Sequence, residues 1–193
     1  MLNFRLGRGL RLETARVFLR RPRLTDWRAW TNLRAASRDF LAPWEPLWPE
    51  DALGIPAYRR RLRQIGYEWR SDQGYAFFIF QRQGGQLVGG VNLSNVRRGV
   101  AQVASLGYWM GETFAHRGLM HEALTALLPY AFERLGLHRI EAACLPHNKA
   151  SRALLGKLGF EEEGYARSYL KIAGRWQDHV LHALLAEDYP ARA

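Results

Sequence analysis

The order of strand-like and helix-like segments across residues 100–160 limits the fold most strongly. A strand-like run at 100–110 is followed by a polar loop and then by an amphipathic helix at 118–135. A second strand at 138–145 runs through the polar turn PHN into a helix at 148–158. A strand, a helix and a strand in this order form a crossover between neighbouring parallel strands, so both helices should begin at the same edge of one sheet.

The other segments place this crossover within a larger sheet. Residues 75–82, 86–96 and 100–110 have the composition and glycine-containing turns of an antiparallel meander. Further strands are expected at 12–21, 160–170 and 175–187, helices at 24–37 and 55–74, and a stiff proline loop at 39–51. Pro129 should kink or shorten the helix at 118–135. A meander followed by a crossover predicts an α+β fold, in which one domain holds a mixed central sheet with helices on both faces.

Length and cysteine usage exclude several classes of protein. The chain has 193 residues and is 48% hydrophobic, which suits one domain, spanning 1–193, with its own core. The single cysteine, Cys144, excludes an intrachain disulfide framework and a cysteine-based zinc site, and we expect no metal. We also expect no signal peptide and no membrane span, because no apolar run reaches about 18 residues. A lone cysteine is compatible with a reducing compartment, and the expected location is cytoplasmic.

The charge of the chain is unevenly distributed. The net charge is +10, and residues 1–38 alone carry ten arginines against Glu13 and Asp26, a local charge of +8. A basic end of this kind favours an anionic partner such as a ribosome or RNA surface. The alternative is a cationic surface that serves solubility, and charge alone does not decide between them.

The loop before the helix at 118–135 has the properties of an anion site. The first turn of a helix leaves its N–H groups free and carries partial positive charge. Gly118 would let a ligand approach the backbone closely, and His116 and Arg117 add charge. This combination suits a pyrophosphate, although a glycine at a helix start can also be an ordinary turn residue.

The start of the helix at 148–158 offers a second set of polar groups. Asn148 stands at the N-cap position, Ser151 lies three residues on in the first turn, and Arg152 is beside it. Taken singly, these residues are typical of any helix start. Together with the loop one crossover earlier, they place two helix starts next to each other beyond the strand ends, where ligands bind in open α/β sheets.

This layout resembles the GNAT acetyltransferase family, and within it the RimJ-type ribosomal-protein-alanine N-acetyltransferases. The matching segments are FLAPWEP, NLSNVRRG, LGYWMG, HRGLMHEALTALL, HRIEAACLPHNKAS and KLGFEEEGYARSYLKIAGRWQDHVLHAL. The resemblance covers about residues 11–189, which we take as the core of the domain. It implies that the cosubstrate is acetyl-CoA and that the acceptor is the N-terminal α-amine of a protein.

The resemblance also implies roles for individual residues. Backbone N–H groups at Tyr108–Met110 should face the thioester carbonyl, Ser151 could protonate the leaving thiolate, and Asn148 could hold the pantetheine or a water. Glu45, in the rigid PWEP loop, could hold the water that acts as base or bind the acceptor's ammonium, or it could be a surface residue. The expected catalytic residues are therefore Ser151, Asn148 and Glu45, and the expected cofactor-binding residues are Tyr108, Trp109, Met110, His116, Arg117, Gly118, Leu119, Met120, Asn148, Ser151 and Arg152.

Three positions depart from the family pattern. Ala115 stands where the phosphate loop usually begins with glutamine or arginine, so one side-chain contact to phosphate is missing. Ala143 stands where many relatives carry a glutamate base, and Leu155 where many carry a tyrosine acid. His147 is a further candidate base, although a turn histidine that faces solvent is the simpler interpretation. Catalysis must then use other groups.

Two other functions remain open from the sequence. The chain could acetylate a small amine or an aminoglycoside, which acidic residues at the acceptor cleft, such as Glu45, Glu50 and Asp51, would favour. It could also be a ribosome- or RNA-binding assembly protein that keeps the fold without turnover, for which the basic segment 1–38 is the marker. The sequence contains no P-loop, no Ser-His-Asp order and no RNA-recognition signature.

Overall fold

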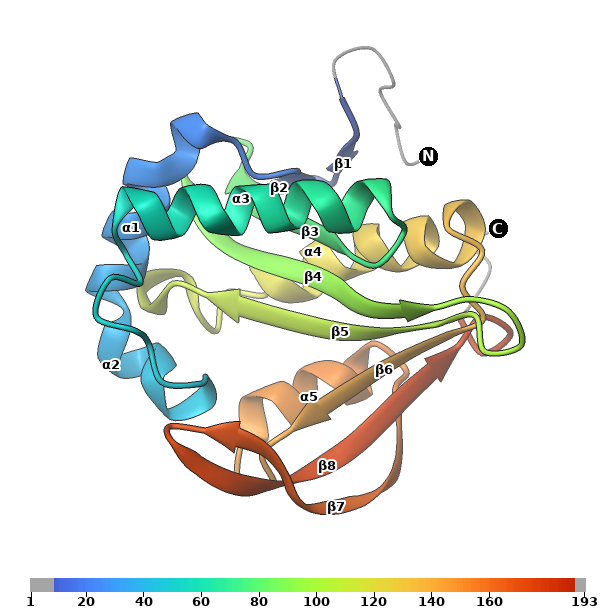
Figure 1. The fold of residues 1–193 in the computed structure, drawn as a ribbon. Coiled ribbons are helices and arrows are strands. Elements are labelled where there is room, and N and C mark those ends of the chain that lie inside the picture. Colours follow the sequence, from blue (N-terminus) through green and yellow to red (C-terminus); the bar gives the residue numbers. More distant parts are fainter. Residues whose placement is uncertain (1–8, 190–193) are drawn as a thin grey trace.

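A computed structural model describes residues 9–189 of the chain and arranges them around one eight-stranded mixed sheet (Figure 1). The strands are β1 (Arg11–Glu13), β2 (Val17–Arg20), β3 (Tyr75–Gln81), β4 (Leu87–Arg97), β5 (Val103–Met110), β6 (Arg139–Cys144), β7 (Glu161–Ile172) and β8 (Arg175–Leu185). Their order across the sheet is β1-β2-β3-β4-β5-β6-β8-β7. Only β5 and β6 run parallel, so the predicted meander and crossover are confirmed.

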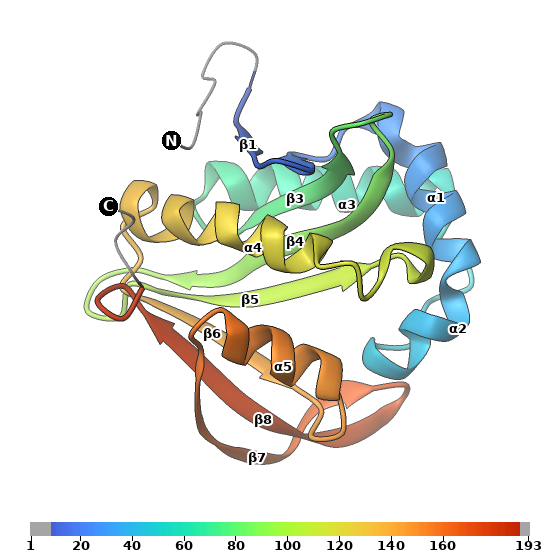
Figure 2. The ribbon, with the colours of Figure 1, turned by 180° about the vertical axis from the view of Figure 1, so that it is seen from behind.

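Helices cover both faces of the sheet, as predicted. The helices are α1 (Trp27–Ala36), α2 (Arg38–Leu41), α3 (Ile55–Arg70), α4 (Leu119–Pro129) and α5 (Lys149–Lys157), with short 3₁₀ turns at Leu24–Asp26, Ala42–Trp44 and Glu112–Phe114. Helices α1 and α3 lie on one face, and α4 and α5 lie together on the other (Figures 1 and 2). Within the described residues, none of these helices combines the length and apolar character needed to cross a bilayer.

Alternation along β3 explains why the molecule has a core on each side of the sheet. Phe77 and Ile79 belong to the larger core, which also contains the buried leucines of α4. Phe78 and Phe80 belong to a smaller core with Trp30 of α1 and Tyr58 of α3. Because successive side chains of a strand point to opposite faces, this almost wholly apolar strand can supply both cores.

The expected strand at 12–21 is a pair of strands. Residues 14–16 form a turn that separates β1 from β2, and the two strands pair antiparallel. The turn is fixed by Thr14, whose backbone N–H donates to the carbonyl of Val17 (2.9 Å) and whose hydroxyl accepts from the N–H of Val17 (3.1 Å). The prediction of one strand was wrong because threonine, although frequent in strands, can also close a turn through its own hydroxyl.

Proline acts differently in two segments. The loop predicted at 39–51 begins with helical structure, because α2 and the 3₁₀ turn Ala42–Trp44 occupy its first part. Pro43 fits the start of that turn, where its missing N–H costs no hydrogen bond. Pro129 ends α4, and the chain continues as one π-helical turn at Tyr130–Arg134. Helical structure thus extends over nearly the whole predicted range, and at Pro129 the helix changes from α to π geometry instead of ending.

The parallel strands β5 and β6 separate from each other along part of their length. The two strands pair only from Val103 to Ser105 on β5 and from Arg139 to Glu141 on β6. Beyond these residues they diverge toward their carboxyl ends, where α4 and α5 begin (Figure 1). The wedge between the strands is the position at which the sequence predicted two neighbouring helix starts.

Candidate active site

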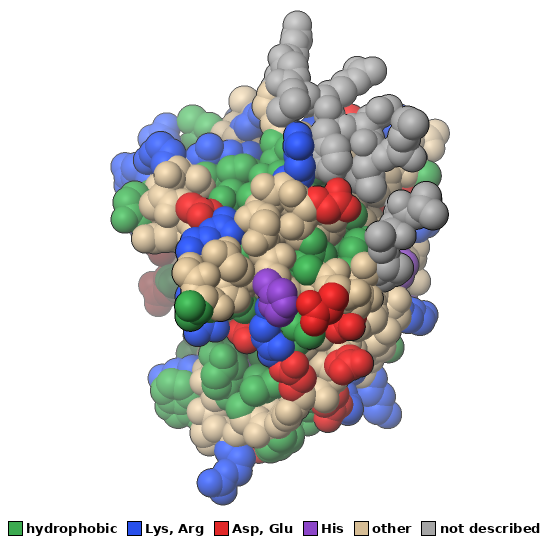
Figure 3. All heavy atoms as spheres, turned by 90° about the vertical axis from the view of Figure 1, so that its right-hand side faces the viewer, with side chains coloured by type: hydrophobic (Ala, Val, Ile, Leu, Met, Phe, Trp, Pro, Cys, Tyr) green, Lys and Arg blue, Asp and Glu red, His purple; other side chains and the backbone are tan. Residues whose placement is uncertain are grey.

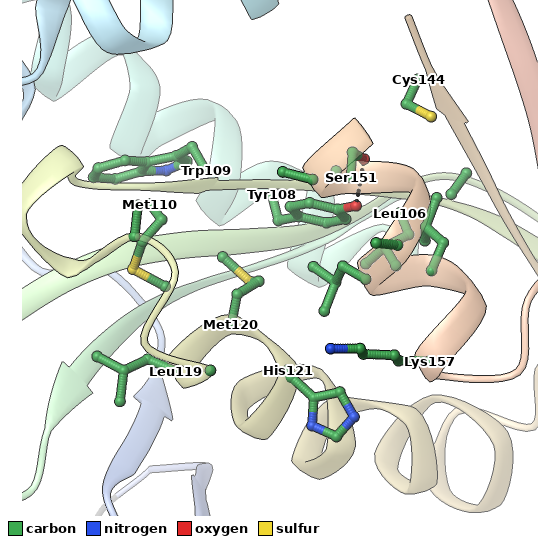
Figure 4. A pocket seen from close by; sticks show the side chains of 18 of the residues that line it. Leu106, Tyr108, Trp109, Met110, Leu119, Met120, His121, Cys144, Ser151 and Lys157 are labelled. Atoms are coloured by element: carbon green, nitrogen blue, oxygen red, sulfur yellow. Dashed lines mark hydrogen bonds between the residues drawn. The ribbon is translucent and has the colours of Figure 1, made fainter. Parts of the chain in front are cut away.

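A cavity of about 2100 Å³ occupies the wedge between β5 and β6. Its lining comes from the loop before α4, the ends of both strands, the start of α5, the segment Phe40–Glu45 and the β7–β8 hairpin. The cavity therefore extends through the wedge. One end lies on the face of the sheet that carries α4 and α5, and the other end lies at the segment Phe40–Glu45. Figure 4 shows side chains of β5, α4 and α5 meeting in this space. Such a shape can hold one reactant on each side of the strands.

The first turn of α4 forms one end of the cavity. Gly118 is the N-cap of α4 with φ +74°, and His116 before it also has a positive φ of 58°. No side chain caps this helix, and the first backbone bond to its N-cap carbonyl is made by the N–H of Glu122 (3.1 Å). The N–H groups of Leu119 and Met120 therefore have no acceptor inside the helix, which is the arrangement that binds phosphate groups.

Arg16 ties the β1–β2 turn to this helix start. Its Nε donates to Oε2 of Glu122 (2.6 Å), and its Nη1 donates to the carbonyl of Arg117 (3.1 Å). Burial raises the pKa of the Glu122 carboxyl, but the hydrogen bonds from Thr14 and Arg16 outweigh that effect and hold the pKa below its usual range. Because Arg16 and Arg82 both line the cavity, cationic side chains lie beside the free N–H groups.

The start of α5 carries a hydroxyl pair on the opposite wall. Oδ1 of Asn148 accepts from the N–H of Ser151 (3.0 Å), so Asn148 caps the helix. The Ser151 hydroxyl lies 2.7 Å from the Tyr108 hydroxyl, across the wedge from β5 (Figure 4). Burial raises the pKa of Tyr108 to about 12, although the bond to Ser151 lowers it. Both hydroxyls are thus protonated at neutral pH and can deliver a proton to an atom in the wedge.

The end of β5 offers backbone groups to the same space. Residues Tyr108–Met110 pair with β4 on one side only, because pairing with β6 stops at Ser105. Main-chain groups of this segment that point away from β4 therefore face the cavity without a strand partner. Free N–H groups at such a position can stabilise an oxyanion.

Glu45 is held by other side chains at the far end of the cavity. Its carboxylate accepts two bonds from the Arg34 guanidinium (2.9 and 2.5 Å) and one from Nε1 of Trp48 (2.8 Å). Its backbone carbonyl accepts from the N–H of Ala173 in the β7–β8 turn (2.9 Å). Next to it, Trp44 packs against His147 in a tilted arrangement, with 5.5 Å between the ring centroids. These contacts join the α2 segment, the β6–α5 turn and the β7–β8 hairpin around one opening.

Most of the residues predicted from the sequence meet in the cavity. Its lining includes Glu45, Tyr108, Trp109, Met110, His116, Gly118, Leu119, Met120, Asn148 and Ser151. Arg117 and Arg152 are not part of that lining. The backbone carbonyl of Arg117 accepts a hydrogen bond from Arg16. Arg152, on the exposed side of α5, forms an ion pair with Glu162 (2.8 Å).

Several lining residues were not found from the sequence. Arg16 and Arg82 belong to segments far from the α4 loop in the chain, so no local pattern marked them. His121 of α4 and Lys157 of α5 point toward the same space (Figure 4). His179 of β8, which is 3% exposed, also lines the cavity. In the sequence, only the alternating pattern of this strand marked His179, and such a pattern indicates a buried side chain rather than a catalytic one. Within residues 9–189, no three His, Cys, Asp or Glu residues are grouped as a metal site would require.

Comparisons with known proteins agree with this geometry. Residues 16–161 match the family described as acetyltransferase (GNAT) domain. The [Ribosomal protein uS5]-alanine N-acetyltransferase of Escherichia coli (strain K12) is 40% identical over 181 residues, which are 93% of this chain and 93% of that protein. Mycobacterium smegmatis RimJ in complex with CoA-disulfide is 34% identical with a TM-score of 0.86, over 95% of this chain and 85% of that chain. The ribosomal-protein-S5-alanine acetyltransferase from Vibrio fischeri is 28% identical with a TM-score of 0.86, over 94% of this chain and 99% of that chain.

Proposed function

Because the chain belongs to the acetyltransferase (GNAT) domain family, we propose that it transfers the acetyl group of acetyl-CoA to the N-terminal α-amine of a ribosomal protein. The acceptor would begin with alanine or a similarly small residue. The observation that carries this proposal is the 40% identity to the uS5-alanine N-acetyltransferase over nearly the whole of both chains. The hydroxyl pair and the free backbone groups in the wedge supply the chemistry that such a transfer needs.

The cavity suits acetyl-CoA bound with its phosphates at α4. The pyrophosphate would lie on the N–H groups of the first turn of α4, next to Arg16 and Arg82. The pantetheine would then enter the wedge, so that the thioester lies between the end of β5 and Ser151. Backbone N–H groups of Tyr108–Met110 would stabilise the oxyanion, and the Ser151–Tyr108 pair would protonate the thiolate.

The charges at the acceptor end favour a peptide α-amine over a polycationic drug. Glu45 is neutralised by Arg34, and Asp51 pairs with Arg60 at the surface. Glu50 and Asp51 do not line the cavity. These three residues therefore do not form the acidic cleft that aminoglycosides or polyamines would require. We propose that Glu45 fixes the shape of the acceptor opening, because its carboxylate is held by Arg34 and Trp48 and its carbonyl by the N–H of Ala173.

We further propose that residues 1–193 act as one acetyltransferase domain, with a core of about 11–189, in the cytoplasm. One sheet holds all eight strands of the described residues, and relatives match the chain over nearly its full length. Contact with a ribosome or RNA surface through residues 1–38 is part of the same proposal. Arg5 and Arg8 lie outside the described residues.

Four of the ten arginines of that segment form ion pairs within the chain. Arg11, Arg16, Arg20 and Arg34 form ion pairs with Glu13, Glu122, Asp26 and Glu45, respectively. On the face shown in Figure 3, acidic and basic side chains also stand side by side. Docking should therefore depend on the other arginines of the segment. Replacing Arg5 and Arg8 by serine should slow acetylation of a ribosomal substrate at low salt and leave peptide turnover intact. The same change at the exposed Arg59 and Arg63 of α3 is the matched control.

The proposed function is tested by release of free CoA thiol with a panel of acceptors. The panel contains peptides with N-terminal Ala, Ser or Met, together with aminoglycosides and polyamines. We expect the highest kcat/KM with a peptide that begins with alanine or a similar small residue. Turnover of only the small amines would move the enzyme to another substrate class. Binding of acetyl-CoA without turnover of any acceptor would favour a protein that keeps the fold for assembly.

A further inference from the structure

We propose that the imidazole of His179 is the general base that takes the proton from the attacking amine. This inference deepens the proposed function, since it assigns the base for transfer to an amine. His179 belongs to β8, is 3% exposed and lines the large cavity. The hydrogen-bonding of its ring, its position in the sheet and the charges around it each support the assignment.

The hydrogen bond of the ring determines which nitrogen is basic. Nδ1 of His179 lies 3.0 Å from the backbone carbonyl of Gln177. A carbonyl oxygen only accepts hydrogen bonds, so Nδ1 carries a proton and donates it. In the neutral imidazole, Nε2 then holds the lone pair. Within residues 9–189, Nε2 has no hydrogen-bond partner, and the Tyr169 ring packs edge-on against the imidazole with 5.8 Å between centroids.

The register of the sheet places this base on the required side. Ala143 of β6 pairs with Leu181 of β8, and His179 is two residues from Leu181 along the same strand. Ala143 and His179 are therefore on the same face of the sheet, diagonal to each other. A methyl group at Ala143 cannot take a proton. The imidazole from the neighbouring strand can supply the missing function on that face.

The other titratable groups near His179 are engaged elsewhere. Asp178, the preceding residue, accepts from the Tyr165 hydroxyl (2.6 Å) and from the N–H of Ser168 (2.7 Å). After α2, the Glu45 carboxylate is held by Arg34 and Trp48, and in the β6–α5 turn the ring of His147 contacts the ring of Trp44. On β7, Tyr169 contacts His179 through its ring. Of these groups, His179 alone combines burial, a place in the cavity lining and an unoccupied lone pair.

The proton balance of the transfer follows from these positions. The amine nitrogen attacks the thioester carbon, and a positively charged nitrogen forms in the tetrahedral intermediate. Nε2 of His179 takes a proton from that nitrogen, directly or through one water. The carbon–sulfur bond then breaks, and the thiolate takes a proton from the Ser151 hydroxyl. Ser151 regains a proton from the Tyr108 hydroxyl, and solvent reprotonates Tyr108. The imidazolium finally returns its proton to solvent, which leaves an amide and free CoA.

His179→Asn separates catalysis from structure. The asparagine amide can still donate to the Gln177 carbonyl from the position of Nδ1, but it lacks a basic nitrogen at the position of Nε2. We expect kcat to fall about tenfold or more, with the Kd for CoA unchanged. The part of the pH–rate profile that reports protonation of an imidazole should disappear. The matched control is His182→Asn on the same strand, because His182 is equally buried (5% exposed), is on the opposite face and does not line the cavity.

The two variants decide the assignment with any acceptor that the wild-type protein acetylates. If His179→Asn keeps the wild-type kcat, or if His182→Asn loses as much activity, His179 is not the base. If His179→Asn does not fold, His179→Gln is measured in its place under the same criteria. Should the wild type acetylate polyamines or aminoglycosides and no peptide, the proposed acceptor is wrong, and the same variants measured with that amine still test the base.

Discussion

Replacing Ser151 by alanine should slow acetyl transfer without weakening the binding of CoA. The change deletes only the hydroxyl that lies 2.7 Å from Tyr108. The cap of α5 remains, because Asn148 accepts from the backbone N–H of residue 151 and not from its side chain. The loss of one partner of a partly buried hydroxyl should cost about 1 kcal/mol of stability. The folded variant therefore remains available for kinetics.

The expected kinetic loss follows from the role of the hydroxyl. General acid catalysis contributes about 10²–10⁴-fold, but a water can replace a deleted hydroxyl in part, so we expect a fall in kcat of about tenfold or more. A tenfold loss is about 1.4 kcal/mol of transition-state stabilisation. Tyr108→Phe should cause a smaller loss, because Ser151 keeps its own proton.

A double-mutant cycle tests whether the two hydroxyls act as one relay. If they do, the double variant should be no slower than Ser151→Ala alone. Steady-state thiol release gives kcat, and calorimetry gives the Kd for CoA. An unchanged kcat in Ser151→Ala would mean that water supplies the proton, and purely additive losses in the double variant would refute the relay.

Three further predictions concern the cofactor end, the acceptor end and pH. Gly118→Asp should abolish CoA binding in calorimetry, because it places a carboxylate at the proposed phosphate site. Gly136→Asp, at a similar φ of +63° but outside the cavity, should retain CoA binding. Glu45→Gln should lower stability by about 1–3 kcal/mol in denaturant titrations and raise the KM for peptide, because it leaves the largely buried Arg34 without its charge partner. An unchanged KM would contradict the role of Glu45 at the acceptor opening. The pKa of Glu122 is held below its unfolded value of 4.5. The contribution of this carboxylate to stability should therefore be present above about pH 4.5 and lost as pH falls through the folded pKa. Melting temperatures that drop equally with pH in the wild type and in Glu122→Gln would contradict this.

The features that the sequence predicted well are those encoded by neighbouring residues. The crossover from β5 through α4 to β6 follows from periodicity within about 60 residues of chain, and the cap of α5 by Asn148 follows from residues three apart. Gly118 was chosen because glycine at a helix start lets a ligand approach the backbone, and in the structure it is the left-handed N-cap of α4. These features required no knowledge of tertiary contacts.

The features that were missed depend on partners far apart in the chain. Arg16 and Glu122 are 106 residues apart in the chain, and only the folded structure shows that they meet beside the start of α4. Tyr108 was chosen for its backbone, and its hydroxyl became part of the site through Ser151, 43 residues later. Glu45 was expected to hold a catalytic water or the acceptor's ammonium, and no local pattern indicates that Arg34 holds its carboxylate.

The central claim is most directly tested by locating the acetyl group on a product. The protein is incubated with acetyl-CoA and with a ribosomal protein whose chain begins with alanine, and fragmentation mass spectrometry identifies the modified nitrogen. The account predicts one acetyl group per chain, on the N-terminal α-amine, and no reaction when that amine is blocked beforehand. Acetylation confined to lysine side chains, or unchanged acetylation of the blocked protein, would contradict it.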